Sequence, residues 1–228
     1  MKTFNNDDYK NVFRYLNILS PQTSDYELAS SMYEILKTTA NPKHVVRVCD
    51  TTVQDGEYFI KELELNLKSN SLTEKFNNID KIAVTASTLG ADVDKKIKYY
   101  SAIDILKATF LDALASVLIE NELDELEFEL HNTYPTYQFS MRFSCGYDDL
   151  SLELQPKIIK SLNATKLIGI SVNSANLMSP MKSITSFIGL SKLSKNASTN
   201  YTDIDVCNNC NLNGKCVTKC RRATQYGK

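Results

Sequence analysis

The chain has 228 residues, of which 43% are hydrophobic and 23% charged, an ordinary composition for a globular protein that buries a sizeable core. Its 26 basic and 27 acidic residues give a net charge of −1, which argues against the basic balance typical of nucleic-acid-binding proteins. The N-terminus carries acidic residues and no long apolar run, and no apolar stretch of about eighteen residues follows. We therefore expect a cytoplasmic protein without nucleic-acid or membrane partners.

The N-terminal segment has the pattern of two helices. Apolar side chains recur at helical spacing over residues 9–18 and predict the first helix. Ser24 and Glu27 have the spacing of a capping box, which predicts that a second helix begins there and runs to about Ala40. The Asn-Pro pair that follows favours a helix end at this point.

Five segments have the composition of β-strands or of a hairpin turn. The β-branched stretch 44–48 predicts a strand, and the apolar stretch 80–87 predicts a buried strand. Residues 55–56 (Asp-Gly) predict the turn of a hairpin. The stretches 166–172 and 184–192 also have strand composition. Alternation of these strands with helices indicates a mixed α/β (α+β) fold in a single domain, with a central sheet.

The strongest helical pattern begins near Ser101 and runs to about Leu130. Its apolar residues form one continuous face. A row of small side chains that ends in a carboxylate runs beside this face and allows a backbone or a ligand to approach closely. The row consists of Ala102, Thr109, Ala113, Ser116 and Glu120. A shorter helix is expected over 152–162.

Two segments carry candidate binding chemistry. Arg142 can hold a carboxylate with two parallel hydrogen bonds, and Gly146 and Tyr147 complete a tight turn after it. Glu120 can pair with a ligand cation. On local chemistry alone, a surface arginine before a β-turn is the simpler interpretation, and an exposed helix glutamate explains Glu120 equally well. The only two histidines lie in segments without a nucleophile signature, so a catalytic triad is not supported.

Four cysteines near the C-terminus have the spacing C-x2-C-x5-C-x3-C, which favours a four-thiolate metal site. Zinc would make this site a structural clip, and an iron–sulfur cluster would make it a redox centre. Disulfides rank third in a reducing compartment. The predicted metal ligands are Cys207, Cys210, Cys216 and Cys220.

Three segments in order resemble the activation domain of cobalamin-dependent methionine synthase. They are AVTASTLGADVDKKIKYYSAIDILKATFLDALASVLIE, RFSCGYDDLSLELQPKI with its R-x-x-x-G-Y turn, and IGISVNSANLMSPMKSITSFIGLSK. The match is closer to small stand-alone members of this family, which also end in a C-x-x-C tail. The resemblance implies an activation-like core over 80–200, with 1–79 as part of the same domain and 201–228 as a metal-binding tail.

The family binds S-adenosylmethionine and supports repair of oxidised cob(II)alamin, with an electron donor such as flavodoxin. The resemblance therefore implies a subunit that is not a complete enzyme alone and whose cobalamin is carried by a separate methionine synthase subunit, since this chain has no D-x-H-x-x-G loop. The residues that it implies for S-adenosylmethionine binding are Glu120, Arg142, Ser144, Gly146, Tyr147 and Tyr201. Two alternatives remain: a metal-cluster redox accessory protein, or a scaffold for a corrinoid methyltransferase.

Overall fold

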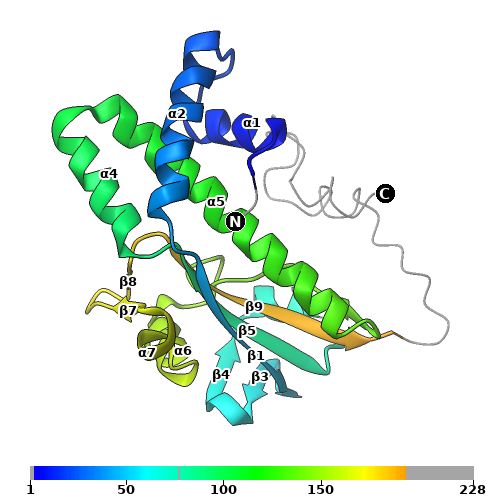
Figure 1. Cartoon of the computed structure of the whole chain (residues 1–228). Coiled ribbons are helices and arrows are strands. Elements are labelled where there is room, and N and C mark those ends of the chain that lie inside the picture. The colour runs from blue at the N-terminus through cyan, green and yellow to red at the C-terminus, as the bar shows by residue number, and fades with distance from the viewer. Residues whose placement is uncertain (1–2, 77, 194–228) are drawn as a thin grey trace. The chain divides into compact units, whose positions relative to one another are not determined.

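A four-stranded antiparallel sheet forms the centre of the protein (Figure 1). The computed structural model describes residues 3–76 and 78–193, so the predicted cysteine tail lies outside the described part. The strand order is β1 (Lys43–Asp50), β5 (Lys81–Thr88), β9 (Ser183–Lys192) and β6 (Tyr137–Phe139). Strand β5 pairs along its whole length with both β1 and β9, and seven of its eight residues are buried. The strands expected at 44–48, 80–87 and 184–192 are thereby confirmed.

A second, three-stranded sheet follows β1 directly. It consists of β2 (Thr52–Gln54), β3 (Glu57–Ile60) and β4 (Leu65–Lys68). Asp55 and Gly56 form the two-residue turn between β2 and β3, and both have positive φ, at 52° and 77°. Asp-Gly suits such a turn because short polar side chains and glycine tolerate left-handed backbone conformations, and the predicted hairpin is confirmed.

The long helix α5 (Ile105–Thr133) crosses the sheet and joins it to a layer of helices (Figure 1). Its N-terminal half packs in an apolar cluster with α1 (Asn6–Tyr15), α2 (Thr23–Thr39) and α4 (Ala91–Ile103). Its C-terminal half covers one face of the sheet, where Leu126 and Leu130 pack with Ala83 and Ile188. The expected mixed fold with a central sheet and a long helix is confirmed.

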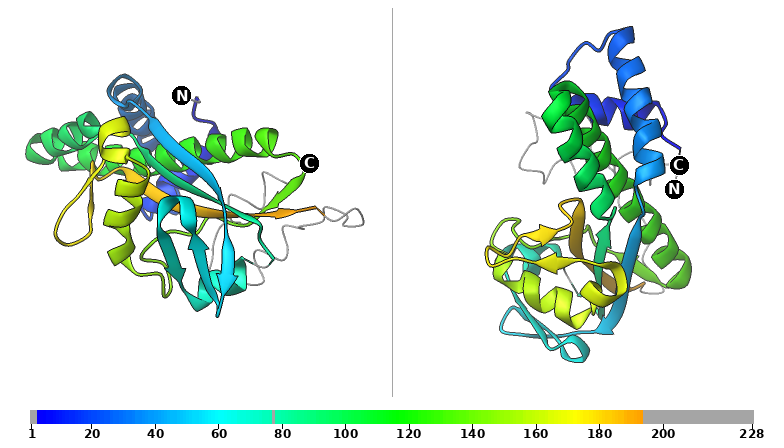
Figure 2. Two further views of the ribbon diagram at one scale, coloured as in Figure 1. Left: turned by 90° about the horizontal axis from the view of Figure 1, so that it is seen from below. Right: turned by 60° about the vertical axis from the view of Figure 1, so that its left-hand side comes forward.

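The opposite face of the sheet has its own core. Ile82 and Val84 of β5 pack there with Phe187 of β9, and the small sheet and the helices after β6 cover them (Figure 2). Besides the sheet of β2, β3 and β4, the covering elements are α3 (Asn70–Lys75), which precedes β6, and α6 (Gln155–Ser161), α7 (Ala164–Ile168), β7 (Ser171–Val172) and β8 (Met178–Ser179), which follow it. The sheet is therefore buried on both faces, with α5 on one side only.

The structure corrects the expected helix over 101–130. The chain leaves α4 at Asp104, whose side chain accepts a hydrogen bond from the backbone N–H of Lys107 and caps α5. Ala102 therefore belongs to α4 and is not part of the row of small residues on α5. Ile103 and Leu106, which continue the apolar pattern, are 62% and 56% exposed at the corner between the two helices.

Two local predictions are also wrong. The N-cap of α2 is Gln22, whose backbone N–H donates a hydrogen bond of 2.7 Å to the Asp25 carboxylate. The N-cap therefore lies two residues before Ser24, where the Ser24–Glu27 capping box was predicted. Residues 164–168 are helical, and the helix ends at Gly169 with φ 77°, where glycine accepts the left-handed conformation. Only Ser171–Val172 of the expected strand 166–172 is extended.

Candidate functional site

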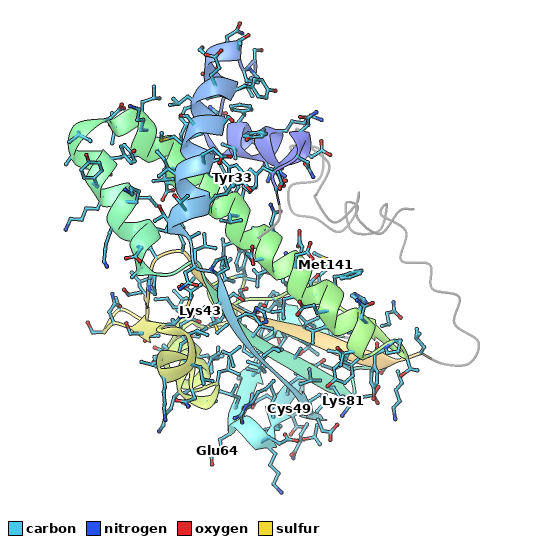
Figure 3. All side chains as sticks on the ribbon, in the orientation of Figure 1. Tyr33, Lys43, Cys49, Glu64, Lys81 and Met141 are labelled. Atoms are coloured by element: carbon cyan, nitrogen blue, oxygen red, sulfur yellow. The ribbon has the colours of Figure 1, made fainter. Side chains whose placement is uncertain are left out.

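Arg142 lies at the edge of the sheet, one residue before a bridge to strand β9. Phe143 and Phe187 exchange backbone hydrogen bonds of 2.9 and 2.7 Å, which fix this segment beside β9. The Phe143 side chain is buried on the face that α6 and α7 cover. Neighbouring side chains of an extended backbone point to opposite faces, so Arg142 points to the face that α5 covers. Figure 3 labels Met141, the residue before it, beside α5.

The guanidinium of Arg142 meets three carboxylates of α5. Its Nη2 atom hydrogen-bonds Asp124 Oδ1 at 2.8 Å and Glu120 Oε2 at 3.1 Å. Its Nη1 atom lies 3.0 Å from Glu127 Oε1, in an ion pair without an aligned hydrogen bond. Glu120 and Arg142, each a candidate from its own sequence segment, are in contact in the structure.

The spacing of these acids explains the arrangement. Residues 120, 124 and 127 are separated by one and two helical turns and therefore lie on one face of α5. Arg142, Asp124 and Glu127 are sheltered, with side chains 7%, 9% and 10% exposed, whereas Glu120 is 37% exposed at the mouth of the cluster. We name these four residues the Arg142 cluster.

Burial and the neighbouring carboxylates shift the pKa of Arg142 in opposite directions. Burial disfavours the charged guanidinium, but attraction by Glu127, Asp124 and Glu120 outweighs it and raises the pKa of Arg142 above its ordinary value. The arginine stays cationic at any physiological pH. One guanidinium therefore pairs with three carboxylates of the same helix.

The R-x-x-x-G-Y turn follows Arg142 and is tightly closed. The Gly146 N–H donates to the carbonyl of Leu150 at 2.8 Å, and the Tyr147 N–H donates to the carbonyl of Ser144 at 3.3 Å. Gly146 has φ 86°, and a Cβ atom there would lie 3.1 Å from the Leu152 side chain, so the position requires glycine. The Tyr147 side chain is 67% exposed and is available to a ligand or a partner.

Asp149 anchors the far end of this turn. Its Oδ2 atom accepts a 2.7 Å hydrogen bond from the Asn70 N–H, and its Oδ1 atom accepts from the Ser71 N–H at 3.3 Å and from the Ser69 hydroxyl. Ser69 in turn caps α3 through the Leu72 N–H at 2.9 Å. These hydrogen bonds, with Ser69 first, lower the pKa of Asp149 to about 2.

The row of small side chains on α5 lines a groove between α1, α4 and α5. The groove has a volume of about 330 Å³, and Thr109, Ala113 and Ser116 contribute to its wall. Lys182 closes one end of the row, with its Nζ atom 2.9 Å from both Ser116 Oγ and Asp112 Oδ1. Lys182 belongs to the segment around Pro180, which we call the proline loop, and is held against α5 by these contacts. The neighbouring Ser183 is buried against Thr88.

Several predicted site residues have no described position. Tyr201 and the four cysteines of the tail lie outside the described residues. Within residues 3–76 and 78–193, no group of three or more His, Cys, Asp or Glu side chains is placed to hold a metal ion. Cys145, inside the turn, is a buried free thiol, and burial raises its pKa to about 12. No described helix is long and apolar enough to cross a membrane.

Three residues of the site were not predicted from the sequence: Asp124, Glu127 and Asp149. Asp124 and Glu127 had a detectable signal, since they lie four and seven residues after Glu120 in a predicted helix and so on the same helix face. Asp149 had none, because its partners lie about eighty residues earlier in the chain and meet it only in the fold.

The sequence matches no protein-family model and no curated protein. Its fold matches a solved structure, described as the MetH reactivation domain bound to AdoHcy, with a TM-score of 0.62. The alignment covers 88% of this chain and 79% of that one at 18% sequence identity. At this identity the likeness concerns the fold. This chain has the fold of the MetH reactivation domain, as its resemblance to the methionine synthase activation domain predicted.

Proposed function

We propose that this chain is an S-adenosylmethionine-binding subunit that supports reductive remethylation of cob(II)alamin in a separate cobalamin-dependent methionine synthase. The observation that carries the proposal is the shared fold with a reactivation domain that was solved with AdoHcy, the demethylated form of S-adenosylmethionine. The ordered sequence resemblance of the α5 segment, the R-x-x-x-G-Y turn and the proline loop supports the same assignment.

The Arg142 cluster has the chemistry to hold the amino-acid end of the ligand. Arginine has five N–H donors, and two hydrogen bonds through Nη2 engage only part of them. An ammonium group can pair with Glu120, the most exposed of the three acids. Nη1 of Arg142 is buried beside Glu127, so a ligand carboxylate reaches it only when these side chains move. The residues proposed to form the site are Glu120, Arg142, Ser144, Gly146, Tyr147 and Tyr201.

The reaction needs one electron and one methyl group. An electron donor such as flavodoxin supplies the electron to the corrinoid, and the sulfonium transfers its methyl group as CH3⁺, leaving the bonding electron pair on sulfur. The products are methylcobalamin and S-adenosylhomocysteine. In this proposal the chain contributes binding and orientation of the methyl donor, while the partner carries the cobalamin.

Binding of S-adenosylmethionine by titration calorimetry tests the proposal. Arg142→Lys keeps a positive charge within the three acids but loses the planar fork, so we expect at least tenfold weaker binding. Arg47→Lys, on the exposed part of β1, is the matched control and should bind normally. Unchanged affinity in Arg142→Lys, or no binding by the wild-type protein, contradicts the assignment.

We also propose that Cys207, Cys210, Cys216 and Cys220 bind zinc or an iron–sulfur cluster. The support is the sequence spacing, together with lysines and arginines in the same segment that offset thiolate charge. Anaerobic purification followed by zinc, iron and sulfide analysis decides between the two. A metal-free, fully alkylatable tail would contradict the proposal.

A further inference from the structure

Asp149, two residues after the R-x-x-x-G-Y turn, ties this turn to a distant part of the chain. Three donors at the start of α3 bind its carboxylate: the Ser69 hydroxyl and the backbone N–H groups of Asn70 and Ser71. Hydrogen bonds to an ionised acceptor are roughly twice as strong as bonds between neutral groups. The carboxylate is therefore occupied by α3 and acts on the turn from outside it.

Helix α3 is a firm support for this link, because its apolar side belongs to the core. Leu72 and Phe76 are fully buried, in one cluster with Ile82 of β5. The Tyr58 hydroxyl also donates a hydrogen bond to the Phe76 carbonyl. A group that is bound to the start of α3 is thereby fixed relative to the central sheet.

Backbone hydrogen bonds transmit the position of Asp149 to the turn. The Gly146 N–H donates to the Leu150 carbonyl at 2.8 Å, and the Leu150 N–H donates to the Tyr147 carbonyl at 3.1 Å. These two bonds close residues 146–150 into one compact loop that contains Asp149. A displacement of Asp149 therefore displaces the backbone of Gly146 and Tyr147 with it.

The turn is thus held at both ends. Its entry is fixed by the paired hydrogen bonds between Phe143 and Phe187 of β9, and its exit by the bonds of Asp149 to α3. Ser144, Gly146 and Tyr147, which belong to the proposed ligand site, lie between these two points.

We propose that Asp149 is a positioning residue for S-adenosylmethionine binding, which holds the R-x-x-x-G-Y turn where its residues contact the ligand. This inference rests on the proposed function, since it takes S-adenosylmethionine as the ligand. Asp149 acts through the turn and does not touch the ligand itself.

Asp149→Asn weakens the link at nearly constant size. It removes the negative charge and replaces one acceptor oxygen by an NH2 group, which cannot accept a hydrogen bond from a backbone N–H. Leu150 stays buried in the core, so the variant should fold while its turn samples further positions. Apparent affinity falls by the fraction of molecules whose turn is correctly placed, so a fraction of about one tenth corresponds to about tenfold weaker binding.

Titration calorimetry with S-adenosylmethionine on the full chain tests this effect. We expect about tenfold weaker binding in Asp149→Asn than in wild type. Ser69→Ala removes one donor of the same link and should also weaken binding, and its effect should not add fully to that of Asp149→Asn. Glu153→Gln removes a carboxylate from an exposed position nearby and should bind normally. Gly169→Ala strains the backbone away from this link and should also bind normally, which separates positioning from a general loss of stability.

A fluorescent probe measures the turn itself, independently of the ligand. The chain has no tryptophan, so Tyr147→Trp places a single one at the exposed end of the turn. With Asp149→Asn added, we expect lower fluorescence anisotropy of this tryptophan, whereas adding Glu153→Gln should leave it unchanged. Urea denaturation of each variant confirms that the comparison is made on folded protein.

The outcomes separate this inference from the proposed function. If wild type binds S-adenosylmethionine and Asp149→Asn binds it equally well, or if the anisotropy is the same with and without Asp149→Asn, the positioning role is overturned and the proposed function stands. Failure of the wild-type protein to bind S-adenosylmethionine contradicts the proposed function and this inference together.

Discussion

Arg142→Ala should destabilise the fold strongly, because it removes the guanidinium that pairs with three acids of α5. Two of the three ion pairs, to Asp124 and Glu127, lie in sheltered surroundings, at 2.8 and 3.0 Å. Removing one partner of a buried ion pair costs about 3–5 kcal/mol. The pair with Glu120 is more exposed and adds little. We therefore expect the free energy of unfolding to fall by about 3–5 kcal/mol at pH 7.

Urea denaturation followed by circular dichroism measures this loss. Adding Asp124→Asn to Arg142→Ala removes the carboxylate charge with which Arg142 no longer pairs, and should recover part of the stability. If Arg142→Ala acted only through lost side-chain packing, the second substitution would give no such recovery. Arg47→Ala, at an exposed position of β1, should change the stability by less than about 0.5 kcal/mol. A loss below about 1 kcal/mol in Arg142→Ala, or no recovery in the double variant, would show that these ion pairs do not stabilise the fold.

Three further predictions concern the turn and its surroundings. Gly146→Ala should cost about 1–2 kcal/mol for the left-handed backbone, and the contact of the new Cβ atom with Leu152 adds to this cost. Gly169→Ala has the same backbone strain but no atom within 4 Å of the new Cβ atom, so it should cost less. Chemical denaturation compares the two variants, and equal losses of unfolding free energy would contradict this prediction. The pKa of Asp149 is lowered to about 2 in the fold, so its stabilising hydrogen bonds are fully present above about pH 4 and are lost as the pH falls towards 2. Over that range the thermal midpoint should fall more steeply in wild type than in Asp149→Asn. Parallel curves of thermal midpoint against pH for the two proteins would contradict this prediction. Cys145 is buried with a pKa of about 12 and should react with iodoacetamide only after unfolding, as peptide mass spectrometry can verify; rapid labelling in the native state would disagree.

Elements with a strong local signal could be predicted from the sequence. The β-branched and apolar runs of β1, β5 and β9 read as strands because every residue contributes to the pattern, and Asp55-Gly56 specifies its turn chemically. The break at Asp104 was hidden, since Ile103 and Leu106 continue the helical period although they are exposed at the corner. Residues 164–168 were misread because a five-residue helix ending at glycine is too short to show its period.

The site was predictable by residue type but not by contact. Arginine followed by a glycine turn indicated carboxylate binding, and a glutamate at the end of a small-residue row indicated a cation partner. That Arg142 meets Glu120, Asp124 and Glu127 depends on how α5 crosses the sheet edge, which no local pattern encodes. The hydrogen bonds from the start of α3 to Asp149 likewise join segments about eighty residues apart in the sequence.

Reactivation of a cob(II)alamin-loaded methionine synthase that lacks its own activation domain is the decisive test of the proposed function. The absorption spectrum distinguishes cob(II)alamin from methylcobalamin, so the assay follows the conversion itself. With a reductant and S-adenosylmethionine present, we predict that methylcobalamin forms only when this protein is added, and that Arg142→Lys supports much slower conversion than Arg47→Lys. Conversion at the same rate without this protein, or no conversion with it, would contradict the account.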